Sequence, residues 1–106
     1  AEISKADWKL LRVKIAEWQE RYMAHLIQEY MQLLSDETQN PSDRFWALEK
    51  KVKNDRRHPG VLIRLQKSNA IYDMVSLIRL GVISFEDLAD FSDNLKECVQ
   101  RILLLH

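Results

Sequence analysis

The side chains spaced like metal ligands are His25 and Glu29. Residues four apart on a helix share a face, so an imidazole and a carboxylate at these positions could hold one ion. A complete site needs at least one further ligand from elsewhere in the chain. His58 lies in a predicted loop and His106 ends the sequence, so neither is placed by helical spacing. We therefore expect no metal site and no cofactor.

Candidate nucleophiles lack the partners that would activate them. Cys98 falls on the apolar side of a predicted helix, where a small core residue is expected. Ser68 and Ser76 are not accompanied by a His and Asp arrangement. The sequence has no GxxxxGKS/T, GxGxxG or CxxC motif. We therefore predict no catalytic residue and a protein that is not an enzyme.

The charged residues, by contrast, are strongly patterned. Sixteen basic and sixteen acidic residues give a formal net charge of zero. The segment 44–67 nonetheless carries eight basic and two acidic residues, a net of +6, whereas residues 1–43 and 68–106 each carry a net of −3. The zero is thus a cancellation, and a directed electrostatic role stays open.

Two stripes with the same helical offsets, i, i+4, i+7 and i+11, concentrate this charge. Each would lie along one side of a helix for about 16 Å. The basic stripe, headed by an aromatic residue, is Trp46, Lys50, Lys53 and Arg57. The acidic stripe is Glu86, Asp90, Asp93 and Glu97. Three interpretations stay open: ordinary solvated faces, complementary surfaces that steer a protein–protein contact, or a basic segment that binds phosphates.

An aromatic stripe runs along the first predicted helix. Its members follow three- and four-residue steps over four turns: Trp8, Leu11, Ile15, Trp18 and Tyr22. If the bundle covers only the helix from Tyr22 onward, the stripe is exposed and typical of an interface, which predicts an antiparallel dimer. If the last helix packs along it, the stripe is buried within one chain.

Beyond Tyr22 the apolar stripe widens, which predicts that the second half of this helix is the more enclosed half. The added residues are Met23, Ile27, Tyr30, Met31 and Leu34. A short apolar face on the next predicted helix consists of Phe45, Leu48 and Val52.

Four helices are predicted, over about residues 5–34, 41–57, 61–80 and 85–104. Capping signals mark their ends: a Ser4–Asp7 box, Asn40–Pro41, Gly81 and a Ser84–Asp87 box. His58-Pro59-Gly60 is the clearest break in the chain.

These elements predict an all-α protein, a small helical bundle of three to four helices with a long N-terminal helix, in a single domain over residues 1–106. Two glycines and two prolines leave little material for the turns of a β fold. The first helix would be roughly 45 Å long, more than a compact domain of this size requires, which favours assembly. The absence of an 18-residue apolar run, the single cysteine and the lack of a signal peptide predict a cytoplasmic protein with no membrane span.

Three blocks of the sequence resemble a group of small, uncharacterised all-helical bacterial proteins, some of which are labelled multidrug transporter. The blocks are VKIAEWQERYM, FWALEKKVKNDRRHPGV and SLIRLGVISFEDLADF. The resemblance implies a bacterial origin and brings no site residues with it. The transporter label does not fit a chain without a spanning segment.

The sequence therefore predicts a non-enzymatic protein–protein interaction module, such as an adaptor, regulator or small inhibitor, that forms a homodimer through the first helix. Aromatic residues would provide affinity and the charge stripes would provide orientation. The alternative is a nucleic-acid-associated protein that uses the basic segment 44–67, although no base-reading residue is conspicuous in it.

Overall fold

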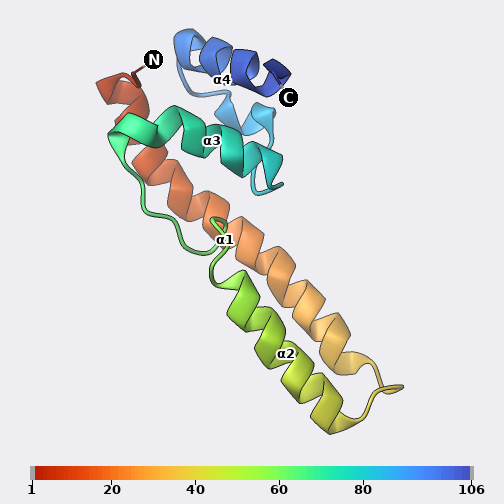
Figure 1. Ribbon diagram of the computed structural model, residues 1–106. Helices are drawn as coiled ribbons and strands as arrows, with labels where there is room; N and C mark the ends of the chain where they lie inside the picture. Colours follow the sequence, from red (N-terminus) through yellow and green to blue (C-terminus); the bar gives the residue numbers. More distant parts are fainter. Residues whose placement is uncertain (1, 106) are drawn as a thin grey trace. The chain divides into compact units, whose positions relative to one another are not determined.

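Figure 1 shows the computed structural model of the chain, in which residues 2–105 are described. The helices are α1 (Lys5–Ser35), α2 (Pro41–Asp55), α3 (Ala70–Arg79) and α4 (Asp93–Leu105), with short 3₁₀ helices η1 (Lys67–Asn69) and η2 (Phe85–Leu88). This part of the chain contains no β-strand. The prediction of a small all-α helical bundle with a long first helix is confirmed.

The described residues divide into two compact units, where the sequence predicted one domain. Unit 1 comprises residues 2–18 and 64–105, and unit 2 comprises residues 19–63. The first part of α1 therefore belongs to unit 1, and its remainder belongs to unit 2.

Unit 1 has a dense apolar core. Its largest fully buried side chains come from α1, α3, η2 and α4: Leu11, Met74, Leu77, Leu88 and Val99. Within the same unit, the ring of Trp18 packs against that of Phe91 at a centroid distance of 6.1 Å. Replacing one of the buried Leu or Met side chains by Ala would lower the free energy of unfolding by about 2–5 kcal/mol.

Asp7 links the first turn of α1 to the start of α4. Its side chain is almost fully buried and accepts hydrogen bonds from the backbone N–H and the hydroxyl of Ser92. The Ser92 hydroxyl in turn accepts the N–H of Leu95 at 3.2 Å, so Ser92 caps α4. The N–H of Asp7 donates to the hydroxyl of Ser4 at 3.1 Å, as the predicted box requires, but the carboxylate is directed to Ser92.

The predicted caps at Gly81 and Ser84–Asp87 are confirmed, whereas Asn40 precedes α2 without a side-chain capping hydrogen bond. Gly81 has a φ of 76°, the left-handed conformation expected after a helix. The N–H of Gly81 bonds to the carbonyl of Ile78, and the N–H of Val82 bonds to that of Leu77, which together form a Schellman motif. Ser84 N–H donates to Asp87 Oδ2 at 2.8 Å at the start of η2.

The predicted helices 61–80 and 85–104 are wrong in part. Residues 61–66 are not helical, and their burial alternates, with Val61, Ile63 and Leu65 half-buried and the residues between them exposed. The helix 85–104 is interrupted between η2 and α4 because the Ser92 side chain bonds to a backbone N–H and starts a new helix there. The helix predicted over 41–57 ends at Asp55.

Unit 2 is a helical hairpin in which α2 lies antiparallel to the second part of α1 (Figure 1). A tight turn at Asp36 and Thr38 joins the helices, and Arg44 Nη1 donates to the carbonyl of Leu34 near the end of α1. At the other end, the ring of Tyr22 stacks on that of His58 at 4.7 Å. Gln19 Nε2 also donates to the carbonyl of Pro59. These two contacts hold the segment that follows α2 against α1.

Candidate functional site

The structure assigns the predicted aromatic stripe largely to the interior of each unit. Leu11 and Trp18 are core residues of unit 1, at 0% and 3% exposure, and are not surface anchors. Trp8 and Ile15 are half-buried, and the guanidinium of Arg12 lies 5.4 Å from the Trp8 ring centroid. Tyr22 is half-buried in unit 2 against His58. The stripe therefore does not offer the continuous exposed surface that a dimer through these residues needs.

The basic stripe is present as an exposed strip on α2. Trp46, Lys50 and Lys53 are exposed, whereas Arg57, also exposed, lies in the turn beyond the helix. The Trp46 ring is 63% exposed and meets the edge of Phe45 at a centroid distance of 5.0 Å. An indole beside two ammonium groups offers stacking and positive charge together.

The acidic residues do not form a stripe on one helix. Glu86 lies in η2, Asp90 lies in the following turn, and Asp93 and Glu97 lie in α4. The prediction failed because the helical offsets apply only within an unbroken helix, and this one is broken before Ser92. Asp90 forms an ion pair with Lys14 at 3.5 Å, and Asp93 forms one with Lys96 at 3.4 Å.

A polar cluster that includes Glu29 from the candidate metal pair joins α1 to α2. Lys51 Nζ lies 2.8 Å from Glu29 Oε1 and 3.4 Å from Asp55 Oδ2. Tyr30 donates to Asp55 Oδ2 at 2.7 Å. Burial, and then the hydrogen bond to Asp55, raise the pKa of Tyr30 to about 12. His25 is exposed, and the described residues contain no group of three metal-binding side chains.

The hairpin has two sides of different polarity. A groove of about 440 Å³ on one side is lined mostly by polar and charged residues of both helices, with Glu29 and Gln32 on α1 and Asp43 and Ala47 on α2 among them. On α1, Ile27 lies about 140° from Gln32 around the helix. On α2, Phe45 lies about 160° from Ala47. The side chains of Ile27 and Phe45 thus lie on the opposite side of the hairpin.

That opposite side exposes large apolar side chains, which we call the apolar face. Its members are Ile27, Met31 and Leu34 of α1 and Phe45 and Val52 of α2, with exposed fractions of 53, 58, 42, 61 and 41%. A groove of about 160 Å³ borders it, lined by Met23, Leu26, Ile27, Tyr30, Asp55, Arg56 and Val61. Isolated exposed apolar residues are common, but five large ones on the same side of two neighbouring helices are typical of an interaction site.

The expectation that the second half of the first helix is the more enclosed half is therefore wrong. Among residues 19–63, Leu26 is the one large apolar residue that is buried, whereas the part of α1 in unit 1 buries both Leu11 and Trp18. The widened stripe and the short apolar face of α2 were the signals of the apolar face. The widened stripe was interpreted as enclosed because periodicity gives the apolar side of a helix, not what covers it.

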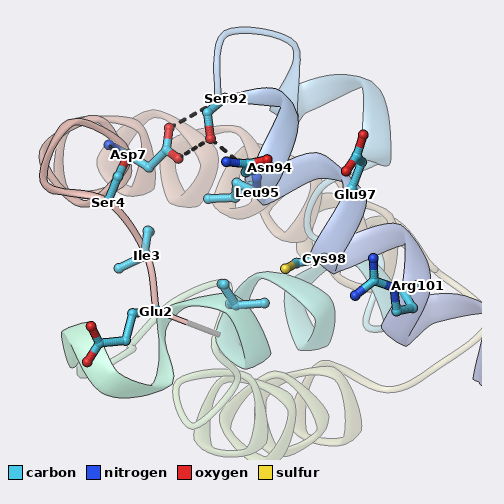
Figure 2. Close-up of a pocket in the computed structure, with 11 residues that line it drawn as sticks. Glu2, Ile3, Ser4, Asp7, Ser92, Asn94, Leu95, Glu97, Cys98 and Arg101 are labelled. Carbon is cyan, nitrogen blue, oxygen red and sulfur yellow. Dashed lines mark hydrogen bonds between the residues drawn. The ribbon is translucent and has the colours of Figure 1, made fainter.

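A cavity of about 470 Å³ lies in unit 1 between the start of α1 and α4 (Figure 2). Asp7 and Ser92 point toward each other at one side of it, and Glu97, Cys98 and Arg101 line the α4 side. Both Asp7 carboxylate oxygens already accept hydrogen bonds from Ser92. The buried carboxylate of this cavity is therefore occupied by the capping of α4.

Comparisons of the chain with known protein families, curated proteins and solved structures find no match. Within residues 2–105, no helix has both the length and the apolar character needed to cross a bilayer. The candidate functional site is therefore defined by the chain's own geometry, and it is the apolar face of unit 2.

Proposed function

We propose that this chain is a non-enzymatic protein–protein interaction module that binds its partner through the apolar face. The observation that carries the proposal is the exposure of five large apolar side chains on one side of a two-helix hairpin. Interface centres are enriched in aromatic residues and Met, and this face carries Phe45 and Met31. A bacterial, cytoplasmic setting is part of the proposal; the single cysteine and the resemblance of three sequence blocks support it.

Site-specific photo-cross-linking tests the proposal. A photoreactive amino acid replaces Phe45 on the apolar face, or Ala47 on the opposite side of the same helix as the matched control. In cells that make the protein naturally, irradiation should give a discrete protein adduct from position 45 and little or none from position 47. If position 45 gives no protein adduct, the apolar face is not an interaction surface and the proposal fails.

A second candidate function is association with nucleic acid, favoured by the exposed Trp46 beside Lys50 and Lys53. Stacking on an aromatic ring and contacts from lysines to phosphates are the elements of single-strand binding. Fluorescence anisotropy with labelled single- and double-stranded oligonucleotides should then show binding that weakens steeply as salt rises. Lys50→Glu with Lys53→Glu should abolish it. No anisotropy change at low salt would remove this candidate.

A further inference from the structure

We propose that the partner of the apolar face is a second copy of the same hairpin, so that two copies of unit 2 form a four-helix arrangement. This inference rests on the proposed function and names its partner. It replaces the first half of α1, which the sequence indicated, with the second half of α1 and α2 as the dimer surface.

The first reason is that, among residues 19–63, Leu26 is the one large apolar side chain that is buried. No residue of α2 is buried within the described range Pro41–Asp55. Two helices bury one seam between them, whereas a stable helical layer needs a second layer on its apolar side. A second hairpin supplies that layer in the arrangement found in four-helix bundles.

The second reason is the area of the apolar face. Five side chains that are about half exposed leave on the order of 400 Å² of apolar surface per copy, since an aromatic side chain presents about 200 Å² and the other four present less. A two-fold interface uses the same patch twice, for about 800 Å² in total before the polar rim is added. Stable interfaces begin at about 1,200 Å² in total, which the rim brings within reach.

The third reason is charge. Residues 19–63 contain seven basic and seven acidic residues, so two copies of the hairpin meet without net repulsion. The members of the apolar face are all uncharged. A strongly acidic or basic partner would find no opposite charge among these side chains, whereas a second apolar face matches the first in polarity.

Analytical ultracentrifugation of the full chain tests the inference. The wild type should sediment at twice the chain mass and dissociate on dilution. Ile27→Glu with Phe45→Glu should weaken the dimer roughly 100-fold or more, because each buried unpaired charge occurs twice in a two-fold interface. The matched control, Gln32→Glu with Ala47→Glu, adds the same charge to the same helices on the polar side and should remain dimeric. Circular dichroism checks that both variants are helical.

A cross-linking measurement keeps the test independent of disruptive substitutions. Met31 lies midway between Ile27 and Leu34 along α1, so a two-fold axis through the face brings Met31 close to its counterpart. In a Cys98→Ser background, Met31→Cys should form a disulfide-linked dimer on mild oxidation, and Gln32→Cys should not. Equal cross-linking of the two variants would contradict the proposed surface.

The outcomes separate this inference from the proposed function. A monomer at millimolar concentration, together with a position-45 adduct to a different protein, overturns the second copy as partner and leaves the interaction module standing. A monomer with no adduct overturns both. A dimer that persists in the Ile27→Glu and Phe45→Glu variant overturns the inference, because another surface must then hold the copies together.

Discussion

Gly60 is the residue at which the hairpin closes, and its lack of a side chain is required by Tyr22. A Cβ atom at position 60 would overlap Cδ2 of the Tyr22 ring. That ring is held in place by stacking on His58, whose Nδ1 accepts the N–H of Gly60 at 3.0 Å. The close approach of backbone and ring therefore leaves no room for a methyl group.

We expect Gly60→Ala to destabilise the protein by about 1–3 kcal/mol through overpacking. In a Tyr22→Ala background most of that cost should disappear, because the obstructing ring is gone. Gly81→Ala is the matched control: its Cβ meets no atom within 4 Å, and its cost of about 1–2 kcal/mol comes from the left-handed backbone. Urea unfolding of the four single and double variants measures the coupling. A Gly60→Ala cost that is unchanged without Tyr22 would contradict the argument.

Tyr30 makes stability depend on alkaline pH. Its pKa rises from 10.0 to about 12 on folding, so its contribution is complete below pH 10 and is lost as the pH rises from 10 to 12, where the unfolded chain ionises first. In Asp55→Asn the acceptor charge is removed, and the phenolate should form at lower pH. Asp43→Asn, an exposed carboxylate on the same helix, is the control. Ultraviolet absorbance of the phenolate measures the pH at which it forms in the two variants. Identical titrations of Asp55→Asn and Asp43→Asn would contradict the prediction.

At this scale the sequence predicted which residues are apolar and helical, but not which of them meet a partner. Trp18 and Phe45 illustrate the difference. Both are aromatic and lie on apolar sides of predicted helices, yet Trp18 packs on Phe91 while Phe45 is 61% exposed. Burial depends on the segments that return to cover a helix, and those contacts join residues far apart in the sequence.

Among the elements, α4 depends on a residue outside itself. The Asp7 carboxylate accepts hydrogen bonds from the N–H and the hydroxyl of Ser92 at the N-terminal end of α4. The helix dipole favours negative charge at that end. We expect Asp7→Ala to destabilise unit 1 by about 2 kcal/mol, because it leaves Ser92 without its buried acceptor. Asp90→Ala removes an exposed ion pair and should cost well under 1 kcal/mol. Thermal unfolding followed by circular dichroism compares the two, and equal costs would contradict the assignment.

The ends of the elements were predictable where a side chain or glycine makes a local bond. Gly81 and Ser84–Asp87 make the bonds that the sequence indicated, and α2 begins at Pro41 as expected although the Asn40 side chain makes no capping bond. The break at Ser92 was missed because the apolar period of Leu88, Phe91 and Leu95 continues across it. Its signal was the Ser-Asp pair itself, which starts helices more readily than it continues them. The extended segment was signalled by the β-branched residues Val61 and Ile63 at alternate positions.

For the whole molecule, the two units should differ in local stability. Unit 1 holds the fully buried core side chains, whereas α2 buries no residue within its described range. Amide hydrogen exchange at low concentration should therefore be slow in α3 and faster in α2, because local opening of α2 exposes little apolar surface. Mass spectrometry of proteolytic fragments measures this. Amides of α2 that exchange as slowly as those of α3 in the monomer would contradict the prediction.

The length of the first helix was predictable, but its cause was not. Continuous apolar periodicity predicted a helix over 5–34, and α1 covers Lys5–Ser35. The excess over one small core was attributed to assembly through the first half. In the structure, the two parts of α1 serve two units, and the first part is covered from within unit 1 by Phe91 and Ser92. The apolar periodicity of α1 is the same whether its first part is covered within one chain or by a second chain. Only the fold distinguishes these two arrangements.

The division of the chain has a consequence for the order of events in folding. Unit 2 is one continuous stretch, residues 19–63, whereas unit 1 is assembled from residues on both sides of it. During synthesis from the N-terminus, about 80 further residues must be made before Asp7 can contact Ser92 and Trp18 can contact Phe91. The entropic cost of closing this loop grows with the logarithm of that separation. The residues that contact one another within unit 2, such as Tyr22 and His58, are all synthesised much earlier. Nascent chains of increasing length should therefore acquire the Tyr22–His58 contact well before Trp18 is shielded from water.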